Sequence, residues 1–153
     1  MSLKNQFSKI LVPIDGSKNA DNALNKALII AEKFDSKLIL IHVISDFIPD
    51  FSTTSEGLQI PNTTVVKIRT AIREQAETMM KKKLDQVQKK KLNCISIIQV
   101  GDVGSEIIQY AEKNNVELVV IGARGLGKFK QLLLGSVSNK VATNSHCPVL
   151  IVK

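Results

Sequence analysis

The sequence predicts an α/β fold with a parallel β-sheet, in a single domain spanning residues 1–153. Three observations indicate this. Short apolar segments alternate with segments of helical periodicity along the chain, the order that builds right-handed β-α-β crossovers. The apolar segments are continuous, which is typical of parallel strands that helices cover on both faces. A chain of 153 residues can also bury on the order of 70% of its unfolded surface around one core.

The opening part of the chain predicts a strand, a helix and a second strand. The first strand is expected at 8–14, where an apolar segment runs into an Asp-Gly-Ser turn. Ser17 can cap the next helix, in which apolar residues recur at steps of three and four as far as Phe34. The second strand, 37–44, is apolar without alternation and is therefore expected in the centre of the sheet.

A long loop and a long helix are predicted next. The segment 45–64 is rich in Pro, Gly, Ser and Thr and has no sustained period, so we predict a loop there. A helix is predicted from 65 to about 92, with an apolar stripe of Ile68, Ile72, Ala76, Met79, Leu84 and Val87. The lysine triplets 81–83 and 89–91 favour its C-terminal half, where positive charge opposes the negative end of the helix dipole.

The second half of the chain continues the alternation of strands and helices. Strands are predicted at 94–100, 117–121 and 148–152, and helices at 105–114 and 137–144. The residues 101–104, between the third strand and the third helix, are predicted to form a turn.

Composition and charge exclude several classes of protein. The six lysines of the two triplets, against Asp85, place +5 of the net charge of +7 in eleven residues, so the basic surface is one helix end and does not favour specific binding of nucleic acid. Cys94 and Cys147 are too few for a zinc site or a disulfide framework. No segment approaches the roughly 18 apolar residues of a membrane span, and residues 1–9 do not resemble a signal peptide. We expect no membrane association and a cytoplasmic protein.

Polar and glycine-rich segments follow two of the predicted strands. Asp15 comes directly after the first strand, Gly122-Ala123-Arg124-Gly125 follows the fourth, and Gly135-Ser136 opens the last helix. Ligands of open parallel sheets bind at the carboxyl ends of strands, where the strand order reverses. Glycines let backbone amides approach an anion, and a helix N-terminus adds free N–H groups and positive potential.

These residue types together favour a nucleoside phosphate as the ligand. A triphosphate could lie between the two glycine segments, with Arg124 as a cation and the hydroxyls of Ser136 and Ser138 nearby. Asp15 would accept hydrogen bonds from the ribose. Two familiar phosphate motifs do not match: Phe129 stands where a Walker A loop needs Ser or Thr, and Lys130 stands where the dinucleotide pattern needs its third glycine.

Five segments form a pattern known from one protein family. They are Pro-Ile-Asp-Gly-Ser at 13–17, Ile-His-Val at 41–43, Val-Ile-Gly-Ala-Arg-Gly at 120–125, Leu-Gly-Ser-Val-Ser at 134–138 and Cys-Pro-Val-Leu-Ile-Val at 147–152. Over its whole length the chain resembles the universal stress protein family. The most specific part is the arrangement G-x2-G-x9-G-[S/T], met by Gly122, Gly125, Gly135 and Ser136, which in the family marks members that bind ATP.

The resemblance implies a fold and an assembly. The fold would be a three-layer, Rossmann-like sandwich around a five-stranded parallel sheet of order 3-2-1-4-5. The segment 45–64 would be the variable region of the family. The protein would form a homodimer through its last strand, 148–152, which is apolar and would otherwise be an exposed edge.

The resemblance also implies the ligand contacts. Asp15 would bind the ribose. The adenine pocket would be lined by Pro13, Ile14, Val43 and Ile121. Ribose and phosphates would be held by Gly122, Arg124, Gly125, Gly135, Ser136, Val137 and Ser138. Mg²⁺ or Mn²⁺ would sit on the phosphates, with no protein metal ligand. Replacing Gly122 or Gly135 by a bulky residue is expected to abolish binding and to leave the fold intact.

Three functions are compatible with this site. The leading hypothesis is a stress-response or signalling homodimer that acts through occupancy by ATP or another adenine nucleotide. One alternative is a slow ATPase, for which no carboxylate or histidine follows the glycine segments closely as a general base. The other is a protein-interaction module with ATP, AMP or cyclic AMP as a structural ligand. We predict no catalytic residue, and neither His42 nor His146 is expected to be one.

Overall fold

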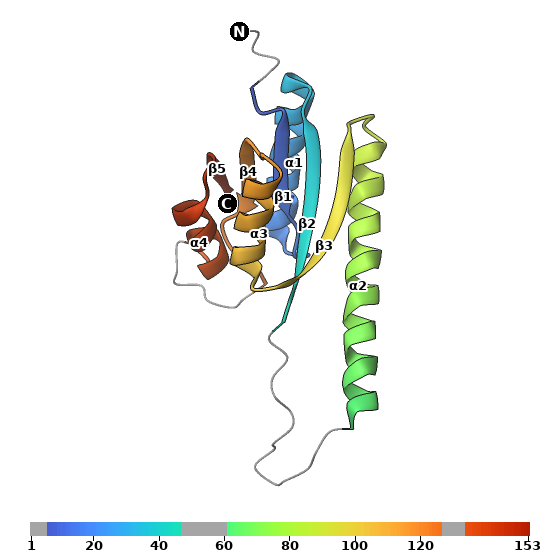
Figure 1. The fold of residues 1–153 in the computed structure, drawn as a ribbon. Coiled ribbons are helices and arrows are strands. Elements are labelled where there is room, and N and C mark those ends of the chain that lie inside the picture. The colour runs from blue at the N-terminus through green and yellow to red at the C-terminus, as the bar shows by residue number, and fades with distance from the viewer. Residues whose placement is uncertain (1–5, 47–60, 127–133) are drawn as a thin grey trace.

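The computed structural model describes residues 6–46, 61–126 and 134–153. Five parallel strands form one sheet in the order β3-β2-β1-β4-β5, between two layers of helices (Figure 1). In chain order the elements are β1 (Lys9–Pro13), α1 (Lys18–Phe34), β2 (Lys37–Ser45), α2 (Asn62–Gln88), β3 (Cys94–Gly101), α3 (Val103–Lys113), β4 (Leu118–Gly122), α4 (Ser136–Asn144) and β5 (Val149–Val152). The predicted three-layer α/β fold and its strand order are confirmed.

Both faces of the sheet are buried, which explains the continuous apolar strands. In β1, Ile10 and Val12 pack toward α1 and α2, whereas Leu11 packs toward α3 and α4. All three side chains are fully buried. Since neighbouring residues of a strand point to opposite faces, a strand covered on both sides needs apolar residues at every position.

The topology places a crevice beside β1. The chain moves from β1 outward to β2 and β3, and then crosses back over β1 to reach β4 and β5. β1 therefore pairs with β2 on one side and with β4 on the other. The loops that leave β1 and β4 diverge at the carboxyl edge of the sheet, which is where open α/β sheets bind their ligands.

Several predicted boundaries are wrong by a few residues. The predicted loop 45–64 is too long at both ends, because β2 includes Ser45 and α2 already begins at Asn62; residues 47–60 lie outside the described residues. The predicted turn 101–104 is mostly taken up by its neighbours: Gly101 ends β3, and α3 begins at Val103. Asp102 caps α3 by accepting a hydrogen bond from the Ser105 amide at 2.9 Å. An Asp at the N-cap satisfies an amide that the helix leaves free, so α3 starts two residues earlier than its apolar pattern indicates.

The predicted apolar stripe of α2 is only partly buried. Ala76 and Val87 are buried, and Met80 is buried more deeply than the predicted Met79. Ile68 and Ile72 are 39% and 40% exposed, which contradicts the prediction. The N-terminal half of α2, to which both residues belong, extends beyond the end of the sheet (Figure 1). Although α2 has 27 residues, no helix in the described parts of the chain is long and apolar enough to cross a membrane.

The two halves of α2 should respond differently to truncation of an apolar side chain. We expect Met80→Ala to lower the free energy of unfolding by about 2–5 kcal/mol, because it leaves a cavity in the core. Ile72→Ala should change it by less than about 0.5 kcal/mol, because Ile72 contacts little of the core. Urea denaturation of both variants measures the difference. A loss above about 2 kcal/mol for Ile72→Ala would instead place this side chain in the core.

Candidate functional site

A cavity of about 480 Å³ lies at the carboxyl ends of β1 and β4. Its lining contains all twelve residues that the sequence indicated: Pro13, Ile14, Asp15, Val43, Ile121, Gly122, Arg124, Gly125, Gly135, Ser136, Val137 and Ser138. These residues come from four separate segments of the chain. The fold therefore brings the whole predicted set together around one space.

Sequence reasoning missed the other residues that line this cavity. They are Ser17, Ala20, Ile41, His42, Val103, Ile107, Leu126 and Leu134. Ile41 and Val43 of β2, with Ile107 of α3, make one side apolar, whereas the glycine segments on the β4 side bring backbone and polar groups. The alternation within β2 could have identified Ile41 as a neighbour of Val43 on the same face. No local signal could have identified Val103 and Ile107, because α3 reaches the cavity only through packing.

Asp15 is held by the turn between β1 and α1. Its Oδ1 accepts a hydrogen bond from the Ser17 amide at 2.9 Å, and Gly16 has the positive φ of 83° that this turn requires. The helix cap itself is Ser17, whose buried Oγ accepts from the Ala20 amide at 3.1 Å. Asp15 is thus not needed as the cap. Its second oxygen, Oδ2, has no hydrogen-bond partner among the described residues.

Gly125 brings the second glycine segment next to Asp15. A Cβ atom added to Gly125 would lie 2.7 Å from Oδ2 of Asp15, so a side chain here would force the carboxylate to move. The absence of a side chain at Gly125 therefore lets the loop after β4 lie against the free carboxylate oxygen in its present position.

The first turn of α4 presents free backbone amides to the cavity. Gly135 caps this helix, and its own amide donates to the Ala123 carbonyl at 2.7 Å. The amides of Ser136, Val137 and Ser138 have no acceptor within the described segments, as helical geometry requires of the first positions. Aligned free N–H groups and the positive end of the helix dipole favour an anion at this place.

Ser138 anchors the helix and does not offer its hydroxyl proton to a ligand. Its Oγ is buried and lies 2.8 Å from the Ala123 carbonyl oxygen and 3.0 Å from that of Gly135. A hydroxyl has one proton, and these carbonyls engage it. The expectation of two available hydroxyls therefore reduces to one, that of the exposed Ser136, with the Ser138 backbone amide beside it.

The glycines of the predicted motif have different physical roles. A Cβ atom on Gly122 would lie 2.7 Å from the Asn19 carbonyl carbon and 2.9 Å from the Ala20 nitrogen, both in the backbone of α1. At Gly135 the nearest protein atom to an added Cβ is 3.4 Å away, and the backbone angles suit any residue. Gly122 is required by the contact between β4 and α1, so the expectation that its replacement leaves the fold intact is not supported.

Of the histidines and cysteines, only His42 lines the cavity. Nδ1 of His42 donates a hydrogen bond to the Ile14 carbonyl at 2.7 Å, and His146 is exposed in the turn before β5. Burial raises the pKa of the Cys94 thiol to about 11 and also raises that of Cys147, so both thiols are protonated at neutral pH. Within the described ranges, no group of three His, Cys, Asp or Glu side chains could hold a metal ion.

Alanine substitutions should separate the roles of Gly122 and Gly135. We expect Gly122→Ala to lower the free energy of unfolding by about 1–3 kcal/mol, since the added methyl group presses on the α1 backbone. Gly135→Ala should change it by less than about 1 kcal/mol, since the methyl group would make only ordinary van der Waals contacts, 3.4 Å or more from the nearest atom. Urea denaturation measures both. A larger loss for Gly135→Ala than for Gly122→Ala would contradict this assignment.

Comparison with known proteins places this architecture in one family. Residues 6–153 match the sequence model of the universal stress protein family. The universal stress protein YxiE of Bacillus subtilis is 31% identical over 147 residues, covering 96% of this chain and 99% of YxiE. The solved structure of MJ0577, which is a universal stress protein of Methanocaldococcus jannaschii, superimposes with a TM-score of 0.81 at 28% identity and covers 97% of this chain and 96% of that one.

Two further solved structures of the same fold contain nucleotides. One is a universal stress protein in complex with cAMP, with a TM-score of 0.69 at 22% identity over 97% of this chain and 98% of that one. The other is the universal stress protein from Archaeoglobus fulgidus in complex with dAMP, with a TM-score of 0.65 at 16% identity over 96% and 98% of the two chains. By sequence match and fold, the chain belongs to the universal stress protein family.

Proposed function

We propose that the cavity binds an adenine nucleotide, ATP in the first place, and that this protein is a cytoplasmic stress-response or signalling protein that acts through occupancy of the site. The observation that carries the proposal is the arrangement of one cavity with three chemically different parts. An apolar side suits a base, a free carboxylate oxygen suits a sugar, and a helix N-terminus with a nearby guanidinium suits phosphates.

Each part of a nucleotide would have its own protein partners. Val43 and Ile121 would contact the base from two strands on either side of β1. Oδ2 of Asp15 would accept hydrogen bonds from ribose hydroxyls. The free amides of Ser136, Val137 and Ser138, with the Arg124 guanidinium, would bind the phosphates.

The fit of a phosphate chain has support in the structure. Gly135 lines the cavity beside three amides that have no acceptor among the described residues, and these amides are available to an anion. A bound Mg²⁺ or Mn²⁺ would neutralise part of the phosphate charge. It would be held by phosphate oxygens, since the described lining offers one carboxylate, Asp15, and that group lies in the β1–α1 turn and not at α4.

Occupancy accounts for these residues better than hydrolysis. An ATPase needs a general base or a positioned water near the γ-phosphate. The described cavity residues around the start of α4 are glycine, serine and valine, and Arg124 is a cation. The nucleotides held by the two solved relatives, cAMP and dAMP, agree with a site that binds adenine nucleotides. The alternative is a protein-interaction module in which the nucleotide is structural. The two functions differ in one respect: in the proposed function, release of the nucleotide changes which proteins are bound, whereas in the alternative it does not.

Replacement of Asp15 tests the proposed sugar contact. In Asp15→Asn the side-chain oxygen can still accept from the Ser17 amide, while an NH₂ group replaces the free acceptor. We expect the affinity for ATP to fall by about tenfold to a hundredfold, the equivalent of one hydrogen bond to a charged group. Isothermal titration calorimetry measures the affinity, and mass spectrometry of the denatured wild-type protein identifies any nucleotide that it carries.

Asp21→Asn is the matched control for this experiment. Asp21 lies in the first turn of α1, shortly after Asp15, but forms an ion pair with Lys83 of α2 at 2.5 Å and is outside the cavity lining. The substitution Asp21→Asn removes the same negative charge as Asp15→Asn, and we expect it to leave the affinity for ATP unchanged. Equal affinities of wild type and Asp15→Asn would contradict the sugar contact. A wild type that binds neither ATP, AMP nor cAMP would overturn the proposed function.

We also propose that the protein forms a homodimer through β5. This strand is at the edge of the sheet, and Leu150 is 39% exposed there. Hydrogen bonds from the amides of Val119 and Ala123 to the carbonyls of Pro148 and Val152 tie β5 to β4. By alternation, the backbone groups of the intervening odd-numbered residues point to the open edge, where another strand can pair.

A lysine on the open edge should prevent this pairing. We expect Leu150→Lys to shift the protein from dimer to monomer, because two like charges would meet in the paired strands. Size-exclusion chromatography with light scattering measures the mass. Ile29→Lys is the control, since Ile29 is an exposed apolar residue that belongs to α1 and not to β5. A dimer that tolerates Leu150→Lys, or a monomeric wild type, would contradict the interface.

A further inference from the structure

The helix that presents the free amides has few anchors of its own. α4 has nine residues, and its buried side chains are Ser138 and Val141. It packs mainly against α3 and makes few contacts with the sheet. Its position relative to the cavity therefore depends on how it is joined to α3.

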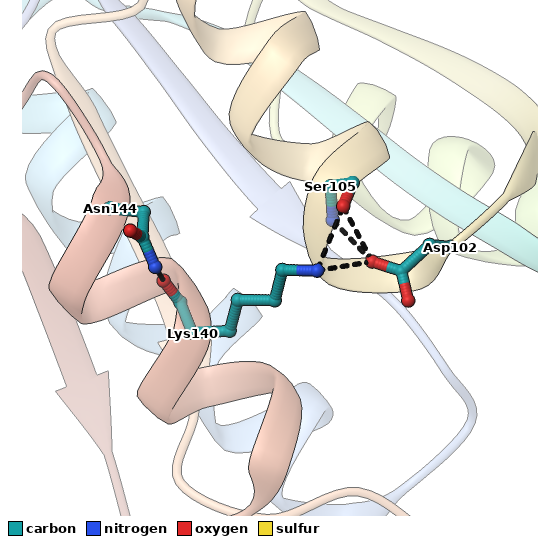
Figure 2. Close-up of polar contacts among 4 residues, drawn as sticks. All are labelled: Asp102, Ser105, Lys140 and Asn144. Atoms are coloured by element: carbon teal, nitrogen blue, oxygen red, sulfur yellow. Dashed lines mark hydrogen bonds and ion pairs between the residues drawn. The ribbon is translucent and has the colours of Figure 1, made fainter.

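A polar cluster joins the two helices, and Figure 2 shows its geometry. Nζ of Lys140 lies 2.7 Å from Oδ2 of Asp102 and 2.8 Å from Oγ of Ser105. The Ser105 hydroxyl and amide donate to the same carboxylate oxygen at 2.7 and 2.9 Å. The hydrogen bonds from Lys140 and Ser105 lower the pKa of Asp102 below its ordinary value of 3.8, so the carboxylate is ionised at neutral pH.

The first turn of α3 accommodates this lysine. A Cβ atom added to Gly104 would lie 2.8 Å from Cδ of Lys140 and 3.3 Å from its Cγ. Because Gly104 has no side chain, the methylene stem of Lys140 can lie across the first turn of α3. Asp102 caps that turn, and Gly104 leaves room for the stem that reaches the cap.

We propose that the Asp102–Ser105–Lys140 cluster positions the N-terminus of α4 toward the phosphates of the bound nucleotide; this inference rests on the proposed function. Lys140 is one helical turn after Ser136, and Asp102 immediately precedes Val103, which lines the cavity. The cluster thus ties the anion-binding turn of α4 to the first turn of α3. None of its three residues lines the cavity, so they are positioning residues.

Asp102→Asn distinguishes positioning from simple attraction of charges. Asparagine is as good a helix cap as aspartate, so α3 keeps its N-terminus while the ion pair with Lys140 is lost. If charge alone mattered, removal of a negative group would strengthen the binding of ATP. Because the cluster positions α4, we expect ATP to bind about threefold to fivefold more weakly, the size of one favourable surface ion pair. Adenosine, which has no phosphate, should bind within about twofold of wild type.

Asp21→Asn serves as the control, because it removes the same charge from an ion pair on the opposite face of the sheet. A double-mutant cycle compares ATP affinity, measured by calorimetry, in the wild type, Lys140→Met, Asp102→Asn and the double variant. The second substitution should weaken ATP binding little beyond the effect of the first. ATP affinity that is unchanged or increased in Asp102→Asn, or an equal loss for adenosine, would overturn the inference alone. Failure of the wild-type protein to bind ATP would instead overturn the proposed function.

Discussion

The contact between the end of β4 and the first turn of α1 is the constraint on which the site depends. At Gly122 the strand meets the backbone of Asn19 and Ala20 so closely that a Cβ atom would lie 2.7 Å from the nearest atom. This contact brings the loop after β4 up to the turn after β1. Gly125 consequently lies against Asp15, and the cavity has a carboxylate on one side of that loop and free amides on the other.

The peptide groups of Ala123 connect the other parts of the site. The Ala123 amide donates to the Val152 carbonyl at 2.7 Å, which ties the loop to β5. Its carbonyl accepts from the Gly135 amide at 2.7 Å and from the Ser138 hydroxyl at 2.8 Å, which ties the loop to α4. Ala123 is buried, so these bonds are shielded from competition with water. A single residue thus joins the proposed anion site to the proposed dimer edge.

The charges around α4 are arranged so that an anion is attracted without a reactive group beside it. Free amides and Arg124 face the cavity, whereas the carboxylate of Asp102 is turned to Lys140 and lies outside the lining. Asp15 keeps one oxygen in its own turn and leaves the other free. Under the proposed function, any consequence of binding has to pass through the elements that line the cavity. Besides the β1–α1 turn, β2 and β4, these include α3, α4 and the loop bonded to β5.

The sequence by itself determined the order of strands and helices, the two-sided burial of the sheet and the polar and glycine segments of the site. It could do so because strand periodicity, turn residues and the glycine motif are local signals. The apolar cavity residues Pro13, Ile14, Val43 and Ile121 were expected only from the resemblance to the family. Only the tertiary structure decided that Gly122 is required by packing against α1 while packing does not require a glycine at position 135, since a glycine looks the same in both cases. Only the structure showed that Ile68 and Ile72 are exposed, because periodicity gives the face of a helix and not what covers that face. The pairing of Asp102 with Lys140, 38 residues apart, likewise required the fold, because two helices meet there that share no local pattern.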